Sequence, residues 1–396
     1  GRCQAAPCQR AGPCPAAQDR GAPPQTKRGG RRSDRRQRAV LVADDVQGLV
    51  AWAHGRLRWA LRRRLAAGAC RGLDREQGRP PALDIPVAQA SRLTRCACRA
   101  SKMGASPVNA TLKPFSKAFK KRASRTLEIF FKVLSAQAKG LPENFVVTLP
   151  KVSHPSEVKG LVAVLNYFEK KYKWRPKAIG IELMVETPEA LFDSKGSLAL
   201  PKLIAAAGGR CLSVHFGTYD YSSSLGIVAS QQRMDHPACE FAKQAMLISL
   251  SGTDVRASDG ATTLLPIPPH RNTQLNSTEI SENREAVRSA WKLSAENIRH
   301  SLSTGFYQGW DLHPAQIPIR YVATYIFFLE NLEPMTKRFK NFSDQSNRAT
   351  QIGGHFDDAA TGRGLMNFFL RGISCGAFSD AEIVNVGVSL RRLKFE

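Results

Sequence analysis

The sequence predicts an α/β fold, a (β/α)8 TIM-type barrel in which parallel strands alternate with helices packed outside them. From residue 114 onward, short apolar runs rich in β-branched residues alternate with segments whose apolar residues recur at helical spacing. Two successive apolar runs lead to acids, Glu186 and Asp220, as expected of strands that end at the mouth of a barrel. The chain has 396 residues, 42% of them hydrophobic, which is enough for one barrel-sized core with residues left over.

The expected elements follow from local signals. Residues 117–138 are expected to form the first helix, because Phe119, Leu127 and Phe130 lie at helical spacing and the turn at Gly140 ends it. The expected strands are 145–149, 179–185, 211–216, 262–267 and 305–312. The expected later helices are 156–172, 188–192, 201–207, 237–250, 285–302, 318–340 and 359–376. These five strands match the fourth to eighth of an eight-stranded barrel, so the barrel is predicted to be incomplete at strands 1–3.

Residues 1–100 have a different composition from the rest of the chain. They contain 21 Lys and Arg, 20 of them Arg, against 7 Asp and Glu, and so contribute +14 of the formal net charge of +25. They also hold six of the nine cysteines and lack a steady apolar period. Such a segment buries too little apolar surface to offset the entropy lost on ordering, so a disordered basic N-terminal head is expected. Within it, residues 40–66 could form an isolated strand or a short basic helix.

Three explanations of this basic head remain open. An Arg-rich disordered arm can bind nucleic acid through phosphate contacts, but the head has no RNP-like aromatic motif, no paired zinc spacing and no Arg-Gly repeat, so a nucleic-acid partner is not expected. A transit peptide would be Arg-rich, but it would also be poor in acids. We favour the third explanation, an incorrect gene model or a replaced exon in front of an enzyme. The expected domains are the basic segment 1–108, the barrel 109–325 and a C-terminal helical extension 326–396.

The sequence also limits the class of protein. No apolar run reaches membrane-spanning length and no secretory hydrophobic segment opens the chain, so we expect no membrane partner. A soluble intracellular protein is expected, cytoplasmic or organellar. Cys211, Cys239 and Cys375 are far apart and lie among apolar residues, which favours core thiols over disulfides or nucleophiles.

Glu186 and Asp220 are the candidate metal ligands. Carboxylate oxygens suit Mg²⁺ or Mn²⁺, and two buried strands would hold the two side chains in place. Each acid also has a simpler interpretation, since Glu186 could stabilise a helix N-terminus and Asp220 could be a turn residue. The occurrence of both acids at successive strand ends favours a metal site.

Four short motifs carry a resemblance to a known family. In chain order they are Val146-Val-Thr-Leu-Pro-Lys151, Met184-Val-Glu-Thr187, Phe216-Gly-Thr-Tyr-Asp220 and Gly309-Trp-Asp-Leu-His-Pro-Ala-Gln-Ile317. Through them, residues from about 110 to 396 resemble the HpcH/HpaI aldolase and citrate-lyase β-subunit family, within the pyruvate/phosphoenolpyruvate-binding barrel superfamily. The long stretches between the motifs resemble an uncharacterised branch of that family.

The resemblance implies roles for several of these residues. Glu186 and Asp220 occupy the positions of the family's metal ligands, and His313 that of a residue that supports the site. Lys151 follows a proline at a predicted strand end, where its charge could face an enolate or carboxylate, or where it could be an ordinary solvated lysine. Lys151 and His313 are therefore the expected catalytic residues.

The implied chemistry is carbon–carbon bond cleavage or condensation, of the aldol or Claisen type, through a metal-stabilised enolate. The implied substrate is a keto acid or an acyl-CoA-like molecule, and Gly217 and Thr218 would offer backbone N–H groups to a substrate carboxylate. A homo-oligomer packed through C-terminal helices is also implied. One position departs from the family, because residues 109–112 read Asn-Ala-Thr-Leu where an arginine on the third strand is expected. Thr111 cannot replace a permanent bidentate cation.

Two functions therefore remain under consideration. The ordered motifs favour a metal-dependent lyase. The missing strands and the absent arginine favour a catalytically inactive barrel fragment whose basic arm binds partners or nucleic acid. We favour the enzyme.

Overall fold

The computed structural model describes residues 109–137, 141–142, 144–344, 350–352, 355–357, 359–385 and 388. The predictions for residues 1–108 lie outside the described residues. Among those described, no helix is both long and apolar enough to cross a membrane.

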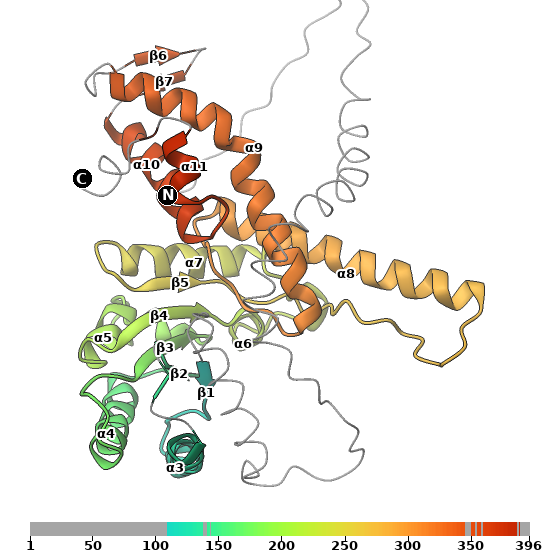
Figure 1. Cartoon of the computed structure of the whole chain (residues 1–396). Coiled ribbons are helices and arrows are strands. Elements are labelled where there is room, and N and C mark those ends of the chain that lie inside the picture. The colour runs from blue at the N-terminus through green and yellow to red at the C-terminus, as the bar shows by residue number, and fades with distance from the viewer. Residues whose placement is uncertain are drawn as a thin grey trace, which may run out of the picture. The chain divides into compact units, whose positions relative to one another are not determined.

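Five parallel strands form the central sheet (Figure 1). They are β1 (Asn109–Thr111), β2 (Val146–Leu149), β3 (Gly180–Val185), β4 (Cys211–Phe216) and β5 (Arg256–Ser258). The strands pair in sequence order, and each pair is parallel, as chain segments with helices between strands require. This arrangement confirms the predicted α/β class.

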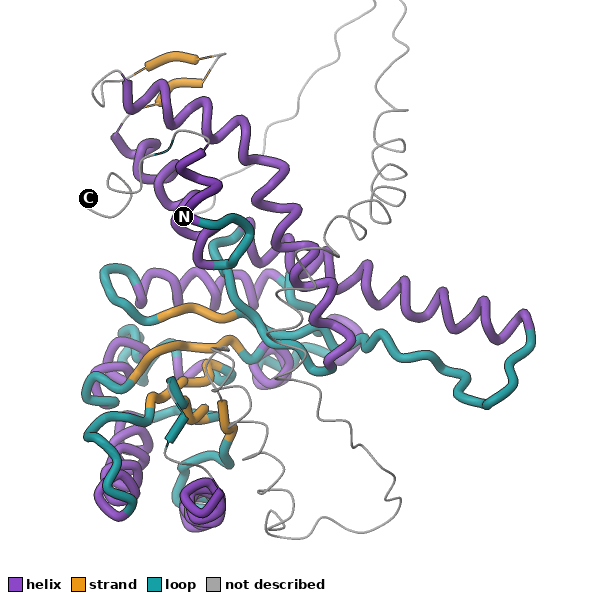
Figure 2. Tube along the Cα trace, in the orientation of Figure 1, coloured by secondary structure: helices purple, strands orange, loops and turns teal. Residues whose placement is uncertain are grey.

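Helices connect the strands and make up most of the chain after β5 (Figure 2). Those that follow β1 to β4 are α3 (Lys120–Gln137), α4 (Pro155–Lys171), α5 (Leu200–Ala206), α6 (Thr218–Ser224) and α7 (Pro237–Leu250), with the short 3-10 helices η1 (Pro188–Ala190) and η2 (Ala229–Gln231). After β5 come α8 (Ser277–Ser303), η3 (Pro314–Gln316), α9 (Ile317–Asp344), the hairpin of β6 (Thr350–Ile352) and β7 (His355–Asp357), α10 (Ala359–Ser374) and α11 (Asp380–Asn385).

The central strands have one apolar and one polar face, because side chains alternate along a strand. On the polar face, Thr148 Oγ1 donates a hydrogen bond to Glu182 (2.8 Å) and Ser213 Oγ donates another to it (2.7 Å). In a TIM-type barrel the face turned away from the helices is the interior, so this polar network lies on the inner side of the sheet. The apolar face joins the main hydrophobic core together with residues of α3, α4, α5 and α7; it includes Val147, Leu149, Ile181, Leu183, Val185, Val214 and Phe216.

A buried ion pair joins α4 to the beginning of β4. Both terminal nitrogens of Arg210 donate to Glu169, each at 2.7 Å, and the two side chains are almost completely buried. Backbone N–H groups of Lys177 and Ile179 also donate to Glu169. Burial opposes ionisation of Glu169, but the Arg210 and backbone hydrogen bonds dominate and lower its pKa.

The later helices have a hydrophobic core of their own, rich in phenylalanine, and polar contacts join this part to the sheet. The contacts come from α8: Ser301 Oγ donates to Asp259 (2.6 Å), and His300 lies 2.8 Å from Glu240 of α7. The core residues come from α8, α9, α10, α11 and the turn before α11, and they include Ile298, Leu302, Phe328, Phe339, Phe342, Phe369 and Phe378.

The predicted strand at 262–267 is wrong. The fifth strand is β5, and residues 262–267 have no regular structure. Pro266 lies inside the predicted range and has no N–H to donate to a neighbouring strand. The predicted last strand, 305–312, is reduced to one parallel bridge between Asp259 and Gly309.

Other boundaries also differ from those expected. β1 adds a strand before the first expected one, and Thr111 pairs with Thr148 of β2. α8 begins eight residues earlier than predicted because Asn276 caps it, accepting from Glu279 N–H while Glu279 accepts from Asn276 N–H. α9 runs without interruption past residue 325, so the expected boundary between barrel and extension does not coincide with the end of an element.

Candidate metal and substrate site

The two candidate acids lie at the same edge of the sheet. Glu186 directly follows β3 and is 4% exposed. Asp220 is the third residue of α6, which begins two residues after β4 ends. β3 and β4 are neighbours in the sheet, with Val185 opposite Phe216, and Gly217 N–H donates to Val185 O (2.8 Å). The pairing of two strands therefore brings together acids that are 34 positions apart in the sequence.

Lys151 contacts both acids from the end of β2. Its backbone N–H donates to Glu186 Oε1 at 2.5 Å, and its ammonium Nζ lies 2.5 Å from Asp220 Oδ1. The residue has φ = 49°, in the left-handed region that non-glycine residues rarely adopt. Lys151, Glu186 and Asp220 thus form one cluster, which we call the carboxylate cluster.

The carboxylate cluster has unusual electrostatics. Burial and the nearby Asp220 raise the pKa of Glu186 to about 7, and the Lys151 N–H only partly offsets them. Burial opposes ionisation of Asp220 as well, but hydrogen bonds from Lys151 and Glu186 lower the pKa of that carboxyl. Glu186 therefore holds a proton more tightly than its neighbour Asp220, because the two carboxyls have different surroundings.

These residues suit a hard divalent cation. Two neighbouring carboxylates repel each other unless a proton or a cation lies between them, and their oxygens are ligands that Mg²⁺ and Mn²⁺ prefer. Two nearby threonine hydroxyls, Thr187 Oγ1 and Thr218 Oγ1, are buried and have no hydrogen-bond partner among the described residues. In the described part of the chain, no group of three or more His, Cys, Asp or Glu side chains could hold a metal, so the protein would supply two acidic ligands here.

Gly217 and Thr218 lie beside the acids. The Gly217 N–H already donates a hydrogen bond to Val185 O within the sheet. A Cβ atom at Gly217 would lie 2.6 Å from Glu186 Cβ and 3.0 Å from Glu186 Oε2, so the missing side chain makes room for Glu186. A Cβ at Gly260 would lie 2.3 Å from Thr218 Oγ1, so a second glycine makes room for Thr218.

His313 lies at the beginning of η3. Its Nδ1 accepts the Ala315 N–H (3.1 Å), and Gln316 accepts the His313 N–H in return. Gln316 Nε2 in turn donates to Thr262 O (2.8 Å). Within the described residues, no hydrogen bond or ion pair joins His313 to the carboxylate cluster.

A histidine that sequence analysis did not select as a site residue lies on β4. The His215 ring stacks on Trp310 with centroids 4.0 Å apart, and its Nδ1 lies 3.0 Å from Ser258 Oγ. Burial, and then the charge of Arg320, lower the pKa of His215 to about 3, so the ring is neutral. Arg320 itself is held by Asp311, with Nε to Oδ2 at 2.8 Å. Alternation along β4 could have placed His215 on the inner face, but its contact with Trp310 depends on the chain path.

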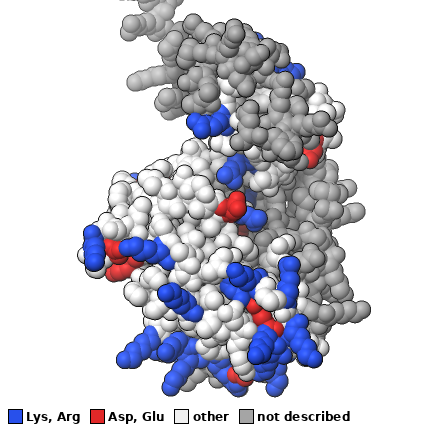
Figure 3. Space-filling view, turned by 90° about the vertical axis from the view of Figure 1, so that its left-hand side faces the viewer, with Lys and Arg blue, Asp and Glu red and all other residues white. Residues whose placement is uncertain are grey.

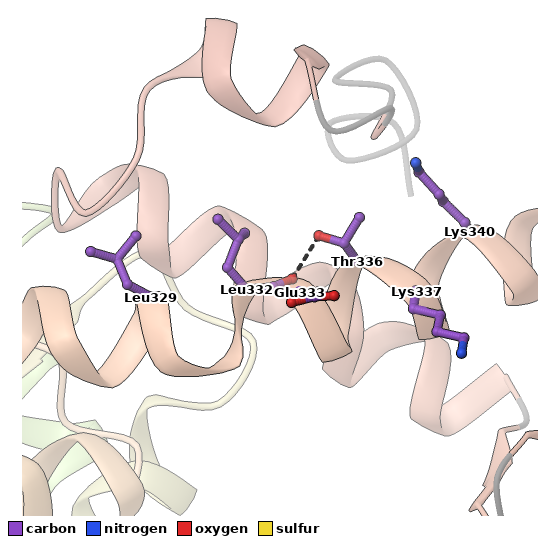
Figure 4. A pocket seen from close by; sticks show the side chains of 6 residues that line it. All are labelled: Leu329, Leu332, Glu333, Thr336, Lys337 and Lys340. Atoms are coloured by element: carbon purple, nitrogen blue, oxygen red, sulfur yellow. Dashed lines mark hydrogen bonds between the residues drawn. The ribbon is translucent and has the colours of Figure 1, made fainter.

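A hollow on the described surface lies away from the motifs. It runs along α9 only and is shallow (Figure 4). Thr336 Oγ1 donates a hydrogen bond to Leu332 O (2.7 Å). None of its lining residues belongs to the carboxylate cluster; they are Leu329, Leu332, Glu333, Thr336, Lys337 and Lys340.

Comparison with known proteins adds a family and a fold. The family model described as "Domain of unknown function (DUF6986)" matches residues 81–396, which include the last part of the predicted basic segment. No curated protein matches the sequence. Among solved structures, a citrate lyase from Burkholderia xenovorans LB400 is similar with a TM-score of 0.54 and 17% identity over 83% of this chain and 92% of that one. This likeness concerns the fold, and it confirms the predicted TIM-type barrel class.

Two further structures have lower scores. CitE from Mycobacterium tuberculosis, in complex with magnesium, acetoacetate and coenzyme A, has a TM-score of 0.44 and 16% identity over 72% of this chain and 85% of that one. A malate synthase from Haloferax volcanii, in a pyruvate/acetyl-CoA ternary complex, has a TM-score of 0.43 and 12% identity over 84% of this chain and 93% of that one. At these scores neither structure bears on the fold or the site.

Proposed function

The chain belongs to the family of the domain described as DUF6986, and from this premise we propose that it is a divalent-metal-dependent carbon–carbon lyase acting on a keto acid or an acyl-CoA-like substrate. The reaction would be an aldol or Claisen type cleavage or condensation. The metal would be Mg²⁺ or Mn²⁺, held by Glu186 and Asp220.

The contact of the almost completely buried Glu186 with a second carboxyl, Asp220, after the neighbouring strand is the observation that carries the proposal. A carboxyl that is 4% exposed and lies against a second carboxyl holds its proton up to about pH 7. A fold selected only for stability has no reason to place two acids in contact at a strand edge, because each disfavours ionisation of the other. Strongly perturbed acids of this kind occur preferentially at functional sites.

Each residue of the cluster would have a distinct role. When bound, the divalent ion supplies positive charge beside the substrate carbonyl, where negative charge develops as the carbon–carbon bond breaks. Glu186 and Asp220 would hold the ion as carboxylates. Lys151 Nζ is half-exposed and is held by Asp220, and it would turn to the substrate's carboxylate when Asp220 binds the ion. Thr218 Oγ1, which has no partner in the described structure, would bind a substrate oxygen.

His313 is proposed as a positioning residue. It caps η3, and η3 holds the backbone of Thr262 through Gln316. Its effect would fall on the loop after Gly260, which packs against Thr218, rather than on the reacting atoms.

Isothermal titration calorimetry with Mg²⁺ and Mn²⁺, with and without pyruvate or oxaloacetate, tests the proposal. The wild-type chain should bind the ion, and the keto acid should tighten binding. Glu186→Gln with Asp220→Asn should abolish binding by removing both negative charges at nearly constant volume. Glu189→Gln is the matched control, since Glu189 is exposed three residues away. A folded wild-type protein that binds neither ion would exclude the proposed function.

Thr111 supports a second candidate, a barrel that binds the metal and the keto acid but does not break the bond. Thr111 ends β1, next to β2, at the strand where the resembled family has an arginine. A hydroxyl cannot provide a permanent bidentate charge for a developing oxyanion.

Deuterium exchange into the methyl group of pyruvate, followed by NMR, separates the two candidates. A lyase should exchange these protons in the presence of Mg²⁺, because exchange requires formation of the enolate. Metal and pyruvate binding without exchange would favour the non-catalytic barrel.

A further inference from the structure

Positive charge is concentrated in one part of the described fold. Residues 109–178 contain 15 Lys and Arg against 4 Asp and Glu, whereas residues 179–396 contain 21 and 22. The basic N-terminal segment, residues 1–108, is not included in these counts. Charge asymmetry of this kind indicates an anionic partner.

The structure places these cations on adjacent helices and on the turn that follows them. Phe131 of α3 packs against Phe168 of α4 and Trp174 of the turn, with ring centroids 5.2 Å and 5.4 Å apart. We call the exposed surface of these elements the basic face, and Figure 3 shows Lys and Arg gathered at the lower end of the molecule, where α3 and α4 lie. With Lys113 and Lys117 just before α3 included, its exposed basic residues are Lys113, Lys117, Lys120, Lys121, Arg122, Arg125, Lys132, Lys159, Lys170, Lys171, Lys173, Arg175 and Lys177.

The described acids of this stretch do not neutralise the basic face. Glu128 bonds to Arg125, three residues before it (2.7 Å). Glu157 caps the N-terminus of α4, and Glu169 is buried against Arg210. Glu157 and Glu169 are therefore engaged elsewhere, while Glu128 lies among the cations and offsets only part of their charge, so the face keeps a net positive charge.

The stability of α3 does not explain its cations. Lys120, Lys121 and Arg122 form the first turn, which contains no acid. Cations at a helix N-terminus oppose the helix dipole, so Lys120 and Lys121 weaken the helix that carries them. By contrast, Lys170 and Lys171 lie in the last turn of α4, where the dipole favours them.

Aromatic rings lie among these cations. Tyr167 on the outer side of α4 is 59% exposed. Lys171 Nζ lies 5.6 Å from the Tyr167 ring centroid and 5.8 Å from that of Tyr172. Surfaces that bind single-stranded nucleic acid combine cations for the phosphates with exposed rings on which bases stack.

We propose that the basic face binds single-stranded nucleic acid, with phosphates on the lysines of α3 and α4 and a base stacked on Tyr167. The sequence motifs of the N-terminal segment had indicated no such partner, but the face lies outside that segment and arises from the packing of α3 on α4. The inference is independent of the proposed lyase, since none of these residues belongs to the carboxylate cluster.

Fluorescence anisotropy of a labelled 20-nucleotide oligouridylate with the full chain tests the proposal between 50 and 300 mM KCl. The test variant replaces Lys120, Lys121, Lys170 and Lys171 with Gln. The matched control replaces Lys195, Lys292, Lys337 and Lys340 with Gln, which removes the same charge from exposed lysines elsewhere and retains the basic N-terminal segment. Circular dichroism checks the fold of each variant.

The test variant should bind about tenfold or more weakly at 150 mM salt, and its salt slope should fall by about 0.7 for each phosphate that the protein no longer neutralises. The control should stay near wild type. Tyr167→Ala should weaken binding about tenfold without changing the slope, as removal of the stacking ring requires. Equal weakening of oligouridylate binding in the test and control variants would overturn the proposal, because binding would then depend on net charge alone. If the test variant loses binding to phosphatidylserine vesicles but binds oligouridylate like wild type, the proposal would be overturned in favour of a membrane-binding surface.

Discussion

Lys151 is held in a left-handed backbone conformation, φ = 49°, in the carboxylate cluster. Non-glycine residues in this region cost about 1–2 kcal/mol, and such strain concentrates at functional sites. The conformation aims the backbone N–H at Glu186 while the side chain contacts Asp220. One strained residue therefore organises both acids.

We expect Lys151→Gly to be more stable than Lys151→Ala by about 1 kcal/mol, because glycine adopts positive φ without steric cost. Both variants lack the ammonium that competes with a cation for Asp220, so both should bind Mg²⁺ at least as tightly as wild type but lose the tightening by keto acid. Urea unfolding and calorimetry measure the two effects. Equal stability of the two variants would show that the backbone relaxes at this position.

His215 should make folding stability depend on pH, because burial and the charge of Arg320 lower its pKa to about 3. The unfolded chain, with a pKa near 6.5, binds the proton more readily, so folding stability should be lost as pH falls below about 6.5. The expected loss between pH 6.5 and 5 is about 1.5 kcal/mol. His215→Phe keeps a ring against Trp310 and should flatten this part of the stability profile in urea unfolding. If the stability of His215→Phe depends on pH as that of wild type does, His215 is not the group responsible for the loss of stability below pH 6.5.

At the scale of elements, α10 contains two glycines in contrasting surroundings. A Cβ at Gly362 would lie 2.4 Å from Phe342 Cζ of α9, whereas a Cβ at Gly364 would have nothing within 4 Å. Gly362 therefore permits close packing of α10 on α9. Gly364 has no such packing reason and weakens the helix.

We expect Gly362→Ala to lower the free energy of unfolding by about 1–3 kcal/mol through overpacking against Phe342. Gly364→Ala should raise it by about 0.5–1 kcal/mol, since alanine restricts the unfolded chain and favours the helix. Thermal and urea unfolding of both variants provide the comparison. A stabilised Gly362→Ala would show that α10 does not pack on α9 in this way.

At the scale of the whole molecule, a buried polar cluster joins the strand-bearing part to the later helices. Lys243 of α7 is fully buried, with Nζ 3.2 Å from Asp259 and 2.7 Å from Glu240. Asp259 also accepts from Ser301 of α8 and from Gly260 N–H. One carboxylate therefore links α7 of the main hydrophobic core to α8 of the second core.

Asp259→Asn should lower the free energy of unfolding by about 3 kcal/mol, because it leaves the buried Lys243 charge with only part of its compensation. Urea unfolding followed by circular dichroism measures the change, and Asp254→Asn in a nearby exposed turn is the control. Stability equal to that of wild type would mean that Glu240 alone neutralises Lys243.

Local sequence signals are sufficient to predict the α/β class, most helices and the strand ends at Glu186 and Gly217, because apolar periodicity and the positions of Pro and Gly can be read without knowledge of distant contacts. It placed the strand after Gly252 wrongly, since Arg256–Ser258 is too short to show a period. Three features depend on the folded chain: Lys151 contacts both acids, His215 stacks on Trp310, and the cations of α3 and α4 share one face. These contacts join residues far apart in the chain, and they exist only where parallel pairing and helix packing bring the segments together.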